Sequence, residues 1–319
     1  MSEKLPEYIV QNSDFIKYGD ARTHVMSPAV KYGLSVFEGL RAYWNVAQQD
    51  LYVFRLNEHT ERLFQSMKLL RFDADFTPDE INQNTIALLR RNRIRQAAHI
   101  RTIAYLDGMG EQDVRGPVSY SISALEKARS KNVERGIRCQ VSCWRRLSDS
   151  TMPPRIKCGG NYVNSRLARS QAKQDGYDEA ILLNQAGQVA EAPGACIFIV
   201  RRNQLVTPDL TSGILESITR DSIIDLAREM GIDVVERTVD KTELYAAKEI
   251  FLVGSAAEVL PVVNVDGIGI GNGERGVITA QLQKAYFEAA SGDTASRHGW
   301  LTSVYGAHHE HQDRHSQPA

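Results

Sequence analysis

Hydrophobic and polar positions in the first half of the chain switch between the spacing of strands and that of helices. Apolar residues recur at helical spacing in 57–70, and Thr77 with the proline after it marks the start of a helix over 77–91. The segments 100–106 and 118–124 instead have the dense apolar pattern of central strands. The pattern therefore predicts helices and strands mixed within this half.

The second half repeats the mixture in another order. Its elements lack the regular strand-helix-strand alternation of a single parallel sheet. We expect strands over 136–144, 179–183 and 249–253, hairpins over 196–206 and 262–270, and helices over 162–174, 219–229 and 277–290. The predicted fold class is α/β, with mixed sheets in two domains.

Charge and loss of periodicity suggest where the domains meet. The stretch after 118–124 is charged and has neither strand nor helix period, as expected of a linker. We predict a smaller N-terminal α/β domain over 1–128, a linker over 129–135, a larger C-terminal domain over 136–305 and a disordered tail over 306–319. That tail contains four histidines but is not expected to form a functional metal site: His308, His309, His311 and His315.

Composition restricts the class of function. The chain has 319 residues, of which 42% are hydrophobic and 24% charged, as in globular proteins. A net charge of −1 gives no bulk attraction to nucleic acid or to an anionic membrane. No signal peptide or membrane-spanning run is predicted, and the four cysteines lack zinc-binding spacing. We expect a cytoplasmic protein without a nucleic-acid, membrane or metal partner.

A glycine pattern near the C-terminus formally matches a dinucleotide-binding motif. Residues 271–276 read G-x-G-x-x-G and precede a helix. A dinucleotide site also needs a preceding parallel strand and a following strand with an acidic residue, and neither is predicted here. Tight turns are the better explanation for these glycines.

Four short motifs in the second half together suit one cofactor. Lys157 precedes two glycines and Tyr162, as a Schiff-base lysine would beside a flat ring that the backbone approaches closely. Glu191 lies beside a turn, where a carboxylate can face a pyridine nitrogen. The stretches 217–220 and 254–258 offer hydroxyls and amides to a phosphate or a carboxylate. Each motif alone also reads as a surface lysine, a turn acid or a helix cap, so it is their joint occurrence that favours a site.

With these motifs the chain resembles the branched-chain amino-acid aminotransferases, which are fold-type IV pyridoxal-phosphate enzymes. The likeness runs from about Tyr8 to Tyr305. Its densest parts are His24 to Ser27, Tyr32 to Gly39, Lys157 to Tyr162, Gly176 to Ala180, Ile218 to Arg220 and Gly254 to Pro261. The resemblance implies a two-domain fold like that of D-amino-acid aminotransferase, with pyridoxal 5′-phosphate bound in the larger C-terminal domain.

The resemblance also implies a role for each matching residue at the cofactor. Lys157 would carry it as a Schiff base and move the reacting proton, Tyr162 would contact the ring hydroxyl, and Glu191 the ring nitrogen. Leu215 would pack on a ring face. The phosphate would be bound by Arg62, Ser217, Ile218, Thr219 and Ser255.

On the substrate side, the resemblance implies that the amides of Ser255 and Ala256 hold the α-carboxylate. Arg101 would receive the distal carboxylate of glutamate. The side-chain pocket would include Tyr32, Phe37, Gly39 and His99, with Tyr32 reaching a neighbouring subunit of a homo-oligomer.

Departures from the family pattern fall near the substrate. His99 stands where the family usually has Tyr, and Glu216 and Ser217 stand where Pro and Gly are common. The segment 192–196 replaces Gly-x-Gly-Glu-Asn, and 125–129 replaces an aromatic loop. A pocket that contains Lys127, Arg129 or His99 would favour a polar or anionic donor over leucine.

The predicted activity is transfer of the amino group of an L-amino acid of the leucine, isoleucine or valine type to 2-oxoglutarate by a ping-pong route, in amino-acid biosynthesis. One alternative is a transaminase of the same fold that acts on a polar or non-proteinogenic amino acid in specialised metabolism. Another is a lyase of the aminodeoxychorismate type. The sequence leaves open the exact donor, the pathway, and whether a dimer or a hexamer forms.

Overall fold

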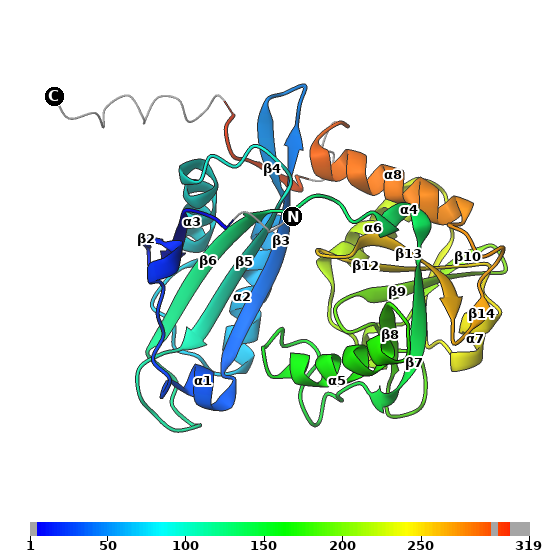
Figure 1. Cartoon of the computed structure of the whole chain (residues 1–319), viewed down its shortest axis with the longest axis horizontal. Coiled ribbons are helices and arrows are strands. Elements are labelled where there is room, and N and C mark those ends of the chain that lie inside the picture. The colour runs from blue at the N-terminus through cyan, green and yellow to red at the C-terminus, as the bar shows by residue number, and fades with distance from the viewer. Residues whose placement is uncertain (1–4, 295–298, 307–319) are drawn as a thin grey trace.

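The computed structural model describes residues 5–294 and 299–306 and consists of two halves, each built on one sheet (Figure 1). In the described residues the first sheet has the order β15-β4-β3-β5-β6-β1-β2, with all neighbours antiparallel. Its strands are β1 (Tyr8–Gln11), β2 (Asp14–Lys17), β3 (Ser35–Asn45), β4 (Asp50–Phe54), β5 (Ala98–Leu106), β6 (Val118–Glu126) and β15 (Leu301–Ser303).

Helices α2 (Leu56–Leu69) and α3 (Pro78–Arg91) pack against this sheet and against each other. Thr77 caps α3 as predicted, because its side chain accepts a hydrogen bond from the N–H of Glu80. Leu63 of α2 is buried in the core of this half. The short helices η1 (Tyr18–Asp20) and α1 (Pro28–Tyr32) precede β3.

The second half is built on a mixed sheet. In the described residues its order is β11-β10-β9-β12-β13-β7-β8, with β14 paired to β13. Strand β7 runs parallel to both β8 and β13, and β10 runs parallel to β11. The strands are β7 (Ile137–Arg145), β8 (Glu179–Leu183), β9 (Cys196–Arg201), β10 (Gln204–Thr207), β11 (Val234–Glu236), β12 (Glu249–Gly254), β13 (Glu258–Val265) and β14 (Ile268–Gly269).

Helices cover the second sheet on different sides. Helix α5 (Asn161–Gln174) packs on β7 and β8, and Figure 1 shows it on the side next to the first half. Helices α6 (Ile218–Glu229) and α8 (Val277–Ser291) pack on each other and on β12. The remaining short helices are α4 (Asn132–Arg135), η2 (Leu210–Ser212) and α7 (Lys241–Tyr245).

The predicted α/β class with mixed sheets is confirmed, but the strands β2, β3, β11 and β15 were not predicted. Strand β3 was not predicted because Leu40, Ala42 and Tyr43 are all buried, so the strand lacks the alternation that marks one solvated face. Strand β15 follows α8 in the chain yet pairs with β4 in the first sheet. The domain limits stay a prediction, and the tail from residue 307 on, with its four histidines, lies outside the described residues.

The glycines of 271–276 form the connection between β14 and α8. Strand β14 is antiparallel to β13, not the parallel strand that a dinucleotide site requires. The N–H groups in the first turn of α8 are also not free to bind an anion. Those of Ile278 and Thr279 donate hydrogen bonds to the carboxylate of Glu249. The chain's own glutamate thus takes the place of an anion at this helix start.

Candidate active site

A cavity of about 430 Å³ is lined by residues of both halves. Strand β3 contributes Phe37 and Gly39, and strand β5 contributes His99 and Arg101. The second half contributes the loops before α5 and α6 and the connection between β12 and β13. Every residue predicted at the site lines this cavity except Tyr32.

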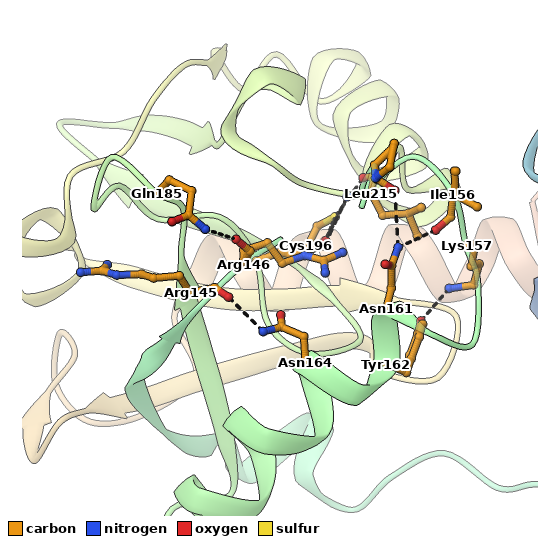
Figure 2. A network of polar contacts seen from close by, with 12 residues as sticks. Arg145, Arg146, Ile156, Lys157, Asn161, Tyr162, Asn164, Gln185, Cys196 and Leu215 are labelled. Carbon is orange, nitrogen blue, oxygen red and sulfur yellow. Dashed lines mark hydrogen bonds and ion pairs between the residues drawn. The ribbon is translucent and has the colours of Figure 1, made fainter. Parts of the chain in front are cut away.

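Lys157 lies in the loop before α5 with its amine inside the cavity. Its Nζ donates to the hydroxyl of Tyr162, in the first turn of α5, at 2.9 Å (Figure 2). The Phe37 ring meets that of Tyr162 edge-on at 4.8 Å between centroids. The N–H of Phe37 donates to the Lys157 carbonyl at 2.9 Å, and the N–H of Gly159 donates to the Ser35 carbonyl at 3.0 Å. The loop of Lys157 is thereby held against β3 of the other half.

Glu191 supplies a buried carboxylate to the same cavity. It is 4% exposed, and its Oε1 accepts from Arg146 Nε at 2.9 Å. The N–H of Leu215 lies 3.3 Å from both carboxylate oxygens. Cys196 Sγ lies 3.6 Å from Oε2, and burial, reinforced by the Glu191 charge, raises the pKa of this thiol.

The start of α6 offers donors to an anion. Ser217 caps the helix by accepting from the N–H of Arg220, and Ile218 and Thr219 are the first two helical residues. N–H groups at these positions have no acceptor within the helix and carry its positive dipole end. Arg62 reaches the preceding loop, where its Nη1 donates to the carbonyl of Glu216 at 2.7 Å.

Arg62 is oriented by a buried acid of β3. Its Nε and Nη2 both donate to Glu38 at 2.7 Å, and Glu38 also contacts His59 Nδ1 at 2.7 Å. Burial raises the pKa of Glu38, but the charge and hydrogen bonds of Arg62 and His59 outweigh it and hold that pKa well below its usual value. Glu38 therefore forms a charged pair with Arg62 in the interior.

The connection between β12 and β13 brings backbone amides to the cavity. Gly254, Ser255 and Ala256 line it, and a Cβ on Gly254 would stand 3.0 Å from the carbonyl oxygen of Gly194. The next strand starts at Glu258, which has a φ of 57° and is 2% exposed. Its carboxylate accepts from the Tyr43 hydroxyl at 2.9 Å and from Arg41 Nη2 at 3.3 Å.

Basic side chains form the wall contributed by β5. A Cβ on Gly39 would stand 3.1 Å from His99 Nε2, so the absence of a side chain there makes room for this imidazole. Burial, together with the charges of Arg101 and Lys127, lowers the pKa of His99 to about 3. The Arg101 guanidinium lies over the Phe37 ring at 4.7 Å and forms no hydrogen bond or ion pair within the described part of the chain.

Tyr32 lies apart from this cavity. It is the last residue of α1, and its hydroxyl donates to Glu111 at 2.7 Å. Sequence reasoning did not assign several charged or polar residues at the site. Glu38 pairs with Arg62 behind the lining, whereas others line the cavity themselves: His59, Arg146, Arg169 and Glu179. Glu38 and Glu179 lie inside segments that match the family, which was a usable signal, whereas nothing local distinguishes Arg146 from its neighbour Arg145.

Comparison with known families decides what this arrangement is. The model of the family described as amino-transferase class IV matches residues 35–265, which include the strands β3 to β13 and the loop of Lys157. The chain belongs to the class IV aminotransferases. Among the residues that the structure describes, this aminotransferase has no helix long and apolar enough to cross a membrane.

Relatives of this class IV aminotransferase match it over nearly its whole length. It is 42% identical to a probable branched-chain-amino-acid aminotransferase of Aquifex aeolicus, over 90% of this chain and 93% of the other. The branched-chain aminotransferase of Thermoproteus uzoniensis, solved with norvaline, has a TM-score of 0.90 and 40% identity, covering 94% of this chain and 100% of that one. The enzyme of Thermobaculum terrenum in its PLP-form has a TM-score of 0.90 and 42% identity, covering 95% and 99%.

Proposed function

We propose that this aminotransferase binds pyridoxal 5′-phosphate through Lys157 and transfers the amino group of an L-amino acid to a 2-oxo acid. The observation that carries the proposal is the Lys157 amine, 2.9 Å from the Tyr162 hydroxyl, in a cavity that also contains Glu191 and the start of α6. An amine, a phenol, a carboxylate and a helix N-terminus match the aldehyde, ring hydroxyl, ring nitrogen and phosphate of this cofactor. The PLP-form of the Thermobaculum terrenum relative supports the same cofactor.

The charges of the donor set also fit the cofactor. The phosphate would lie at the N–H groups of Ile218 and Thr219, with Ser217, Ser255 and Arg62 beside it, because these groups combine a helix dipole with a cation. Leu215 is the lining residue expected to pack on the ring. Since Glu191 is buried and ionic, it suits a protonated ring nitrogen.

In this proposal each residue has one task. The bound cofactor supplies a ring that stabilises negative charge on the substrate Cα. Lys157 Nζ takes the proton from Cα, and the Tyr162 hydroxyl keeps that amine in position. The amides of Ser255 and Ala256 bind the α-carboxylate, which orients the Cα–H bond toward Lys157.

The proposed donors are leucine, isoleucine and valine, and the proposed acceptor is 2-oxoglutarate, by a ping-pong route in which the first 2-oxo acid leaves before 2-oxoglutarate binds. Phe37 and Gly39 would border the donor side chain. Relatives named as branched-chain aminotransferases support these donors. Arg101 supports the acceptor, because its guanidinium is unpaired among the described residues and suits a distal carboxylate.

A polar or anionic donor is the second candidate. The observation that favours it is a wall where His99, Arg101 and Lys127 all line the cavity. The cations Arg101 and Lys127 would stabilise an anionic side chain, the neutral His99 imidazole could hydrogen-bond to a polar one, and leucine would find little apolar surface to cover. A lyase of the aminodeoxychorismate type would share Lys157 but would not need 2-oxoglutarate.

A homo-oligomer is also proposed. Tyr32 lies on α1 outside the cavity of its own chain, as expected if it serves a neighbouring copy. The number of copies and a cytoplasmic location stay predictions from the sequence.

The proposal is tested by turnover of the purified protein loaded with pyridoxal 5′-phosphate. With L-leucine, L-isoleucine or L-valine and 2-oxoglutarate, we expect glutamate and the matching 2-oxo acid. Lys157→Ala should slow turnover by about 100-fold or more and lose the cofactor mass that borohydride fixes to the chain. Lys173→Ala, an exposed lysine at the end of α5, should change neither.

Other outcomes separate the alternatives. Covalent cofactor on the Lys157→Ala protein would refute the role of that lysine. Turnover with polar or anionic donors alone would establish the second candidate. Release of a 2-oxo acid without any need for 2-oxoglutarate would instead establish a lyase.

A further inference from the structure

Arg146 forms an ion pair with Glu191 inside the protein. Its Nε lies 2.9 Å from Glu191 Oε1, and the two side chains are 8% and 6% exposed. The backbone of Arg146 is also fixed, because its N–H donates to the carbonyl of Leu183 at 2.8 Å and its carbonyl accepts from Gln185 Nε2 at 3.0 Å (Figure 2). The cation is thus held in place from the end of β7.

The surroundings of this guanidinium are unfavourable for stability. Arg146 Nη1 is buried without a hydrogen-bond partner, and so are the side-chain oxygens of Asn161 and Asn164. Figure 2 shows both asparagines, on the first turns of α5, near Arg146. A buried donor or acceptor left unpaired is unfavourable, because it has lost its hydrogen bonds to water without replacement. Such local violations tend to occur at functional sites, so stability alone does not explain an arginine here.

The other contacts of Glu191 are neutral. Leu215 offers a backbone N–H and Cys196 a thiol. Among the described residues, no cation besides Arg146 forms an ion pair with this carboxylate. The charge of Glu191 in the interior therefore depends on one arginine.

We infer that Arg146 is a positioning residue that holds the Glu191 carboxylate charged and aimed at the cofactor's ring nitrogen. This inference rests on the proposed role of Glu191. The guanidinium is in direct contact with the carboxylate, so its positive field stabilises the negative charge of that group, which would in turn pair with a proton on the ring nitrogen. Without this cation the carboxylate would be a buried charge with no ionic partner among the described residues, which is unfavourable in the interior.

The test compares Arg146→Met with the matched variant Arg145→Met, which replaces an adjacent exposed arginine. The first readout is the dissociation constant of pyridoxal 5′-phosphate from each cofactor-free protein, by equilibrium dialysis. We expect about tenfold weaker binding for Arg146→Met, since a hydrogen bond to a charged group is lost, and no change for Arg145→Met. The second readout is the pH dependence of the absorbance of bound cofactor, which should shift in Arg146→Met alone.

Lysine at position 146 separates charge from packing. Arg146→Lys keeps a cation, so it should recover part of the cofactor affinity and of kcat, with KM for the amino acid less affected than kcat. Arg146→Lys also serves as the test if Arg146→Met does not fold. The lysine side chain is shorter and reaches Glu191 less well, so some loss of affinity for pyridoxal 5′-phosphate must remain. Wild-type affinity and spectrum in Arg146→Lys and Arg146→Met would overturn the inference.

A double-mutant cycle shows whether Arg146 acts through Glu191. In a Glu191→Gln background, Arg146→Met should cause no further loss of cofactor affinity, because no carboxylate remains to be positioned. Equal losses in both backgrounds would overturn the inference and leave Glu191 in its proposed role. If Glu191→Gln itself changed neither affinity nor turnover, the proposed role of Glu191 would fail instead.

Discussion

His99 illustrates how a single residue acquires its properties from residues distant in sequence. It lies on β5 opposite Arg41 of β3, and Arg101 and Lys127 add positive charge to its surroundings. Burial is the largest cause of its lowered pKa of about 3, and these cations act in the same direction. The imidazole is therefore neutral at physiological pH, and it offers the cavity a hydrogen-bonding group without adding charge.

The lowered pKa predicts an acid-dependent loss of stability. Below the usual value of 6.5 the unfolded chain binds a proton at His99 that the folded chain does not. Stability is therefore complete above that pH and falls as the pH approaches the folded value of about 3. In urea unfolding between about pH 7 and about pH 4, His99→Gln should lose less stability than the wild type. The control His24→Gln, at an exposed position, should lose as much stability as the wild type. The prediction would be contradicted if the free energy of unfolding changed equally with pH in all three proteins.

Pairs of elements are joined by buried charges at the site. Glu38 on β3 binds Arg62 through two hydrogen bonds and His59 through a third, and both partners lie on α2. Packing of Leu63 and Met67 holds the same helix against the core. Hydrophobic burial thus favours the packing of α2 on β3, and the hydrogen bonds of the charged cluster fix how the two elements are oriented. They also orient Arg62 toward the loop before α6.

Glu38→Gln is expected to destabilise the protein. The change leaves the Arg62 cation buried without its counter-ion, which costs about 3 kcal/mol in the free energy of unfolding. Urea denaturation at neutral pH should show this loss, and Glu61→Gln, an exposed position on the same helix, should show almost none. Because the pKa of Glu38 is lowered in the fold, its contribution is present above its unfolded value and is lost on acidification. An unchanged unfolding midpoint would mean that the pair is not formed in solution.

At the scale of the whole molecule, a few contacts between residues distant in sequence fix the position of one half relative to the other. Arg41 on β3 and Glu258 on β13 form an ion pair with side chains 2% and 3% exposed, and Tyr43 also donates to Glu258. Arg55 similarly reaches Asp221 and Ser222 of α6. Since the cavity has walls from both sheets, these contacts set its shape.

Arg41→Met should weaken this connection between the halves. Removing the cation leaves Glu258 buried without its ionic partner, so we expect about 3 kcal/mol less stability toward urea. We also expect weaker binding of amino-acid substrates, because Glu258 adjoins the Ser255–Ala256 segment of the cavity. Arg166→Met, an exposed arginine on α5, is the control. Loss of stability with an unchanged KM would limit Arg41 to a structural role.

The sequence by itself determined the features that depend on local chemistry. Thr77 before Pro78 and Ser217 before Ile218 cap their helices through bonds to residues three positions on, so such starts are readable from neighbours alone. The short motif from Lys157 to Tyr162 likewise places an amine beside a phenol within one loop and helix turn. Together with the family resemblance, these signals predicted the fold class and cofactor-side residues such as Lys157, Tyr162 and Glu191, all of which line the cavity.

Only the tertiary structure decided which distant residues meet. Strand β3 is buried on both faces and β15 joins a sheet formed early in the chain, so neither shows a period that the sequence could reveal. Arg146 and Glu191 are paired across separate loops, as Arg41 and Glu258 are across the two sheets. Electrostatic pairing depends on distance and burial in space, and spacing along the chain contains no information about either.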